Sequence, residues 1–80
     1  MNKKQVGKYT IEEPTVGTLF PIMGLMESDP QLFQMKLAAA CVYGSDGEPL
    51  GEEGVKALGI KEYMGLMTEL MEVAGFSDPK

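Results

Sequence analysis

The 80-residue sequence contains no histidine and no arginine, and its single cysteine is Cys41. Histidine is the usual general base near neutral pH and the commonest metal ligand, so its absence argues against both roles. One cysteine can form no internal disulfide and cannot complete a zinc site. We therefore expect a protein without catalytic residues, metal or cofactor, in a reducing compartment.

The charge balance is acidic, with 7 basic residues against 12 acidic ones and a formal net charge of −5. All the basic residues are lysines, and they gather only at Lys3, Lys4 and Lys8. A nucleic-acid binder needs clustered cations for the phosphates and often arginine for the bases. We therefore expect no nucleic-acid partner.

Length and hydropathy indicate one small domain that folds in the cytoplasm. A chain this short holds a single modest core, and a hydrophobic fraction of 44% is typical of a folding protein. No apolar run approaches the roughly 20 residues that span a bilayer. No apolar segment follows the N-terminal lysines, so neither a membrane anchor nor a secretory signal is expected.

The first part of the chain predicts an arm and an extended segment. Residues 1–8 are polar and lysine-bearing, which is typical of a flexible arm. Tyr9 and Ile11 then alternate with polar residues, which indicates a short half-buried strand or extended segment that ends at Pro14.

A first helix is predicted from apolar residues at spacings of three and four, namely Val16, Leu19, Phe20, Met23 and Met26. Either Thr15 or Thr18 is its N-cap. Because Pro21 is harmless only within a first turn, we favour Thr18.

A second helix begins at Asp29 as N-cap, with Pro30 at its first position, and is predicted to continue through Tyr43. Polar residues are scarce on every side of it, which predicts a central helix covered by its neighbours. Cys41 lies in this apolar segment. We interpret it as a small buried hydrophobe rather than a reactive thiol.

Turn residues from Gly44 to Gly47 separate this helix from the last part of the chain. The turn does not fit a calcium loop, because Val42 and Gly44 would occupy ligand positions. A short helix is predicted over 52–58, and a long one over 60–74 with Gly75 as its C-cap.

The expected architecture is mostly all-α: a small bundle of three helices plus one short helix, preceded by a short extended N-terminal arm. Residues 1–8 form the flexible arm, 9–76 a single helical domain and 77–80 a tail. The pairs Glu12-Glu13 and Glu52-Glu53 do not predict catalysis, because adjacent side chains point apart and no nucleophile accompanies them. The protein is not expected to be an enzyme.

Methionine is the most informative residue, with seven in the chain. Apolar residues cover about half of the last helix, more than the roughly 100° stripe of an ordinary surface helix. Unbranched methionines either fill a small irregular core or form an adaptable binding surface. Both interpretations stay open. For the second, the partner-binding residues are Met23, Met26, Met64, Met67 and Met71. So much apolar helix surface also favours a homo-oligomer.

The order of segments resembles the small tail assembly chaperones of long-tailed bacteriophages. The resemblance covers residues 9–76 and rests on Tyr9-Thr10-Ile11-Glu12-Glu13-Pro14-Thr15-Val16, an apolar helix ending in Ala39-Ala40-Cys41-Val42, the Asp46-Gly47-Glu48-Pro49-Leu50 turn and a Leu/Met-rich last helix closed by Gly75. Pro21 and Gly24 depart from the pattern by interrupting the first helix.

This resemblance implies a helical protein in the cytoplasm of an infected bacterium. It implies binding to the tape measure protein before tail polymerisation, with the tail tube protein as a further candidate client. Two other interpretations stay open. One is a permanent virion component, such as a neck, baseplate or decoration subunit held by a symmetric interface. The other is an unrelated bacterial helical regulator.

Overall fold

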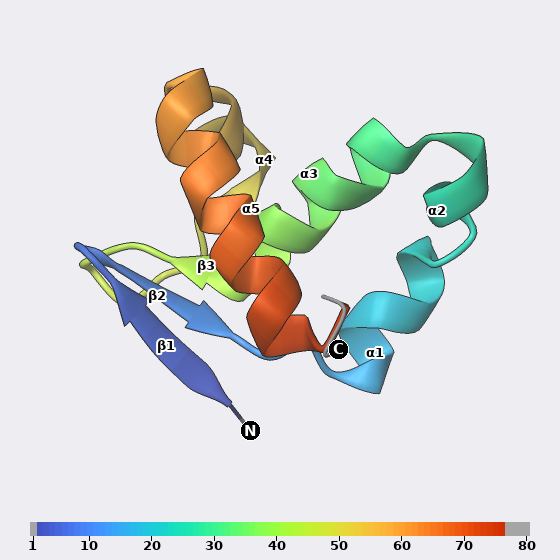
Figure 1. Cartoon of the computed structure of the whole chain (residues 1–80), viewed down its shortest axis with the longest axis horizontal. Helices are drawn as coiled ribbons and strands as arrows, with labels where there is room; N and C mark the ends of the chain where they lie inside the picture. Colours follow the sequence, from blue (N-terminus) through green and yellow to red (C-terminus); the bar gives the residue numbers. More distant parts are fainter. Residues whose placement is uncertain (1, 77–80) are drawn as a thin grey trace.

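The computed structural model describes residues 2–76 and combines a three-stranded antiparallel sheet with helices (Figure 1). The strands are β1 (Lys3–Val6), β2 (Tyr9–Glu12) and β3 (Val42–Tyr43), in the order β1-β2-β3. The helices are α1 (Val16–Leu19), the 3₁₀ helix η1 (Phe20–Ile22), α2 (Leu25–Ser28), α3 (Pro30–Cys41), α4 (Gly51–Lys56) and α5 (Ile60–Ala74).

The prediction of a mostly all-α bundle with an extended arm is wrong. The structure is a mixed α and β fold, 59% helical and 15% strand. The segment expected to be an arm contains β1, which pairs with β2. The predicted tail, residues 77–80, lies outside the described residues.

A tight turn explains why β1 folds back on β2. Val6 pairs with Tyr9, so only Gly7 and Lys8 lie between the strands. Gly7 has a φ of 60°, and no residue other than glycine has a positive φ in the described chain. A positive φ at only the first central residue is the geometry of a type II′ turn, which matches the natural twist of a hairpin. The Gln5 side chain closes the turn by donating to the Gly7 carbonyl (3.0 Å) and the Tyr9 carbonyl (3.1 Å).

The third strand replaces the end of the predicted second helix. α3 stops at Cys41, and Val42 adopts extended geometry with φ −101° and ψ 123°. Val42 pairs with Ile11 of β2, and both side chains are fully buried. A β-branched valine and an aromatic Tyr43 suit a strand, and this pairing outweighs continuation of the helix.

The first predicted helix is a chain of short pieces. Thr15, not Thr18, is the N-cap, because its Oγ1 accepts a hydrogen bond from the Thr18 N–H at 3.2 Å. Pro21 then lies within η1. Proline cannot donate to the carbonyl four residues earlier and clashes with it, so the α-helix that starts after Thr15 tightens into a 3₁₀ turn.

The two longer helices begin or end at local signals that the sequence shows. The Asp29 carboxylate accepts a hydrogen bond from the Leu32 N–H at 3.2 Å, which confirms the predicted start of α3. α5 has the predicted bounds, and Gly75 ends it with a φ of 84°. The Phe76 N–H donates to the Met71 carbonyl at 2.9 Å, which completes the helix end.

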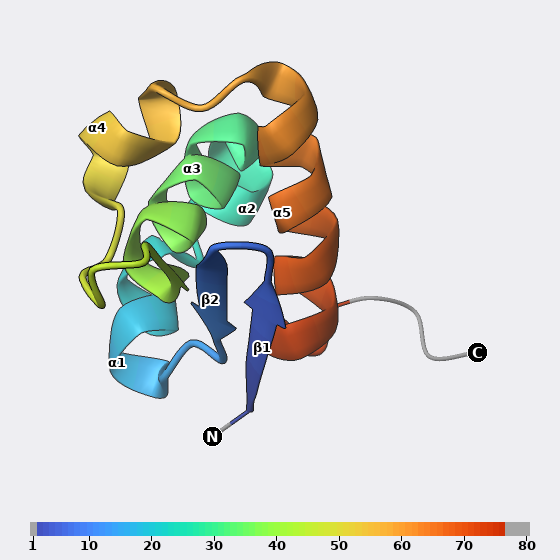
Figure 2. The same ribbon diagram turned by 90° about the vertical axis from the view of Figure 1, so that its left-hand side faces the viewer.

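The core lies between the sheet and the two longer helices. Figures 1 and 2 show α5 running along β1 and β2, while α3 leads directly into β3. The buried residues of α3 are Phe33, Leu37, Ala38, Ala39 and Cys41, and those of α5 are Leu66, Met67 and Leu70. α3 is therefore the central helix that its apolar composition predicts. Within residues 2–76, none of the helices has both the length and the apolar character needed to cross a membrane.

Candidate protein-binding groove between α3 and α5

Two adjoining hollows form a groove along α5 where it faces α3 and the end of α2. One hollow, of about 230 Å³, is lined by Gln34, Tyr63, Met64, Met67, Thr68 and Met71. The other, of about 260 Å³, is lined by Met26, Pro30, Phe33, Gln34, Met71 and Phe76. Gln34 and Met71 line both hollows, so the two lie side by side. These ten residues are called the methionine groove below.

The methionine groove carries no charged side chain, although 24% of the chain is charged. Four of its ten residues are methionines, from α2 and from α5. An uncharged lining offers no partner for an ion or a phosphate. Flexible thioether side chains instead make favourable contacts with apolar groups of varied shape.

The methionines expected to bind a partner occupy different depths. Met64 lies on the rim with 62% of its surface exposed, and Met71 is half-buried along the floor. Met67 is 7% exposed and belongs to the core cluster. Met26 is exposed in the groove, whereas Met23 is exposed outside it. Of the five methionines, Met67 is therefore a core residue, whereas Met23, Met26 and Met64 lie at the surface.

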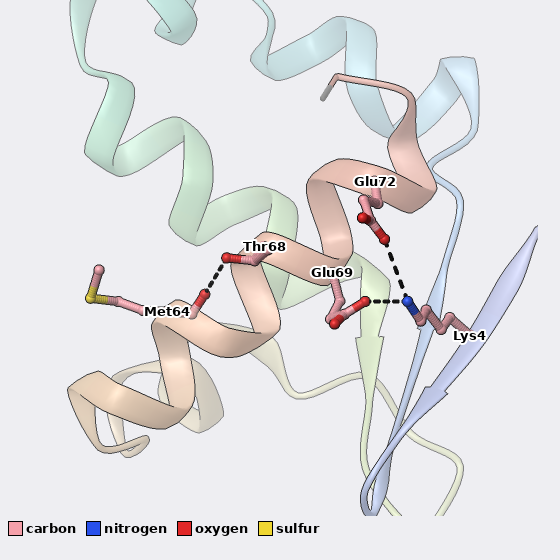
Figure 3. A network of polar contacts seen from close by, with 5 residues as sticks. All are labelled: Lys4, Met64, Thr68, Glu69 and Glu72. Atoms are coloured by element: carbon pink, nitrogen blue, oxygen red, sulfur yellow. Dashed lines mark hydrogen bonds and ion pairs between the residues drawn. The ribbon is translucent and has the colours of Figure 1, made fainter. Parts of the chain in front are cut away.

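Helical spacing explains how α5 supplies one wall of the groove. Met64, Met67 and Met71 follow one another at intervals of three and four residues, which places them on one side of the helix. The Thr68 hydroxyl donates to the Met64 carbonyl at 3.1 Å and is therefore engaged within the helix (Figure 3).

Phe76 closes one end of the groove. The left-handed geometry of Gly75 turns the chain back after α5, so the Phe76 ring lies against Phe33 of α3. The two ring centroids are 6.3 Å apart and the planes are tilted by 59°, a favourable aromatic arrangement. Phe76 therefore joins the end of α5 to α3.

Two polar side chains give the groove its limited polarity. Tyr63 is partly buried, and burial raises the pKa of its hydroxyl. Gln34 is exposed, and its amide makes no hydrogen bond to another residue of the described chain. The Gln34 amide is therefore available to a bound segment.

The opposite side of α5 forms ion pairs with the sheet. Lys4 of β1 lies between Glu69 and Glu72 of α5, with its ammonium 3.4 Å from the Glu72 carboxylate (Figure 3). The hydrogen bond to Glu69 is the main cause of the raised pKa of Lys4. This ion-pair cluster fixes the hairpin against α5.

Cys41 and Glu52, two of the residues considered for catalysis, have environments that the structure defines. Cys41 is buried, and burial, aided by the nearby Glu12, raises the pKa of its thiol to about 11. Glu52 is paired with Lys36 at 2.8 Å, which lowers its pKa. Over residues 2–76, no three acidic, cysteine or histidine side chains gather in a way that would hold a metal ion.

Sequence reasoning missed the α3 contribution to the groove. The sequence pattern predicts a second helix with few polar residues on any side and a last helix with a broad apolar face, and neither prediction indicates a groove between them. The polar Gln34 within the apolar segment is a local signal of an open side of α3. The chain matches no protein-family model, no curated protein and no solved structure, so the chemistry of the groove is the basis for a functional assignment.

Proposed function

We propose that this protein is a tail assembly chaperone that holds an apolar helical segment of the tape measure protein in the methionine groove. The observation that carries the proposal is an uncharged groove in which four methionines lie at depths from the exposed rim to the core. The resemblance to phage tail assembly chaperones supplies the identity of the client.

The shape of the groove favours a helical client. It lies between two helices, where an amphipathic helix can lay its apolar face. Such a client presents anchors at intervals of three and four residues. Met64 and Met71 lie seven residues apart, on the same side of α5, and can contact anchors on successive turns of the client. The Gln34 amide can bond a polar group at the edge of the client.

Methionine suits transient holding better than permanent attachment. Its unbranched side chain adapts to anchors of different size at little cost, so one groove accepts successive segments of a long client. The client must leave before tail polymerisation, and a methionine-rich surface without charged side chains permits that release.

A second candidate function has one observation in its favour. Val16 of α1 and Phe20 of η1 are 64% and 63% exposed, and both are rigid apolar residues on the same side of the segment, four positions apart. Exposed rigid anchors are typical of a permanent interface. This face supports a permanent virion component, or a homo-oligomer, held through α1 and η1.

Quantitative mass spectrometry of infected-cell lysate and of purified virions from the same culture separates the two functions. A chaperone is abundant in the lysate and absent from the particles. Stoichiometric recovery in the particles would establish a structural subunit instead, and detection in uninfected cells would contradict the phage assignment.

Two exposed methionines provide a matched test of the groove. Met26 and Met23 are 42% and 40% exposed, but only Met26 lines the methionine groove. Met26→Gln is expected to weaken the binding of a co-expressed tape measure fragment by about tenfold, the loss of one well-packed apolar contact. Met23→Gln is expected to leave it unchanged. Equal effects would place the client elsewhere.

A further inference from the structure

A third hollow lies next to the methionine groove, where α4 leads into α5 beside α3 (Figure 2). It has a volume of about 270 Å³, and its lining includes Gln31, Met35, Val55, Lys56, Leu58 and Ile60. It is called the α4 hollow below. Tyr63 lines both the α4 hollow and the methionine groove, so the two lie side by side.

Exposed apolar side chains continue from the methionine groove into the α4 hollow. Ile60, the first residue of α5, is 72% exposed, which is the largest exposed fraction of any large apolar residue in the described chain. Met64 lies one turn further along α5 and is also exposed. A client that covers both residues buries more apolar surface than one that ends at Met64.

The extent of this surface sets the length of a helix that covers it. The α4 hollow and the methionine groove together reach from Ile60, at the start of α5, to Phe76, just beyond its end. The 15 residues of α5 span about 22 Å at 1.5 Å per residue. A client helix of about four turns therefore lies along the whole surface.

Lys56 is the only charged side chain among the described residues that line the α4 hollow and the methionine groove. It forms no ion pair with another described residue, including Glu53 three positions earlier. Glu52, one turn earlier on α4, is held by Lys36 at 2.8 Å. The hydrogen bond to Lys36 is the main cause of the lowered pKa of Glu52, and the charge of Lys56 is the smallest. An uncharged apolar surface therefore ends in one unpaired positive charge.

The position of Lys56 also has a local explanation. Lys56 is the last residue of α4, where a positive charge interacts favourably with the helix dipole. That effect concerns the stability of α4 and does not depend on a bound partner. Measurements of stability and of binding therefore separate the two roles.

We propose that the client is a helix of about four turns that lies along the whole of α5, with an acidic residue beyond its apolar side chains that pairs with Lys56. The apolar side chains of the client contact Ile60 and the methionine groove. This inference rests on the proposed function, because it extends the surface on which the client lies. It adds a chemical requirement: the client has an uncharged apolar side and a carboxylate at one end of it.

The test uses capped helical peptides of about five turns, with leucine and alanine along one side and a glutamate at each end. A second peptide has glutamine in place of each glutamate. Isothermal titration calorimetry measures the affinity of the full chain for both. The ratio of the two affinities is called the glutamate preference below.

Lys56→Gln is expected to lower the glutamate preference about fivefold, the effect of one exposed ion pair. Lys61→Gln is the matched control. Lys61 also forms no ion pair with a described residue, but it lines the hollow between the β1–β2 turn and α5 rather than the α4 hollow. The control changes the net charge by the same amount and is expected to leave the glutamate preference unchanged.

Ile60→Gln tests the apolar part of the α4 hollow. It is expected to weaken the binding of both peptides about tenfold, through the loss of one apolar contact, and to keep the glutamate preference. Because Ile60 and Lys56 are exposed, neither substitution threatens the fold. Urea denaturation checks that both variants are as stable as the natural chain.

Equal effects of Lys56→Gln and Lys61→Gln on the glutamate preference would overturn the proposal, because they would reflect net charge alone. A loss of stability in Lys56→Gln without a change in the glutamate preference would assign Lys56 to the end of α4 instead. If Met26→Gln weakens peptide binding but Ile60→Gln and Lys56→Gln do not, the client ends within the methionine groove. The proposed function would then stand and this inference would fail. If neither peptide binds the natural chain, the groove accepts no apolar helix and both fail.

Discussion

The two sides of α5 differ in chemistry although each borders a hollow in the surface. One side carries Met64 and Met71 into a groove without charge. The other carries Gly65 and Glu69 toward the hairpin, where Lys4 forms ion pairs (Figure 3). A single helix therefore borders an uncharged apolar hollow on one side and a polar, charged one on the other.

The difference shows how one short chain can offer two surfaces of different specificity. Successive residues of a helix are separated by about 100°, so neighbours such as Met64 and Gly65 face different hollows. A partner that binds one side leaves the other side free, provided that the helix itself stays in place. The predictions below test that separation.

The largest loss of stability is expected from a substitution at a buried residue between the two sides of α5. Leu70 is fully buried between them. Leu70→Ala is expected to lower the free energy of unfolding by about 2–5 kcal/mol, through lost burial and a cavity. Urea denaturation measures the loss, and binding of the tape measure fragment should weaken with it. Stability equal to that of the natural chain would contradict the burial of Leu70.

A smaller difference in stability is expected between substitutions of two methionines on the same side of α5. Met67→Gln places an amide in the core and is expected to destabilise the fold by about 2–4 kcal/mol. Met64→Gln, on the exposed rim, should change stability by less than about 0.5 kcal/mol. Urea denaturation of both variants checks the contrast. Equal destabilisation would mean that Met64 is also a core residue.

The burial of Met67 and the exposure of Met64 could not be predicted from the sequence. Met64 and Met67 lie on the same apolar half of α5, and no local pattern distinguishes them. Which one is buried depends on where α3 and the sheet pack, and that placement involves residues far apart in the chain. The starts and ends of the longer helices were predictable because Asp29, Pro30 and Gly75 act through their immediate neighbours.

The alternation of Tyr9 and Ile11 with polar residues indicated β2, but β1 and β3 were not predictable, for a related reason. β1 is an exposed edge strand, and its polar, lysine-bearing sequence is also typical of a flexible arm. It forms a strand because it pairs with β2, not because of its own hydrophobic pattern. β3 is two residues long and continues an apolar helix, so periodicity cannot reveal it. The hollow of about 570 Å³ between the β1–β2 turn and α5 needs both elements, so it could not be predicted without the pairing of β1 with β2.

Gly65→Ala tests the hairpin side alone. Alanine is favoured over glycine in a helix interior, and its methyl group has open space, so the free energy of unfolding should rise by about 1 kcal/mol. Urea denaturation measures the gain. The tape measure fragment should bind the variant unchanged, since Gly65 does not line the methionine groove. A loss of stability would show that the helix is packed more closely there than the structure indicates.

The smallest effect concerns the ion pairs that join the hairpin to α5. The hydrogen bond to Glu69, and then the charge of that carboxylate, raise the pKa of Lys4 above its ordinary value of 10.5. A raised lysine pKa means that the folded state favours the charged form. The stabilisation is therefore complete below the ordinary value and is lost as the pH rises through the pKa of the folded protein.

Lys4→Gln removes this contribution, so the stability difference between the natural chain and the variant should shrink as the pH rises past 10.5. Ionisation of Cys41, whose pKa is about 11, affects both proteins equally and cancels in the difference. High salt near neutral pH should shrink the same difference, because exposed ion pairs are screened. A difference that stays constant with pH and salt would assign the role of Lys4 to the packing of its aliphatic stem on α5 rather than to its charge.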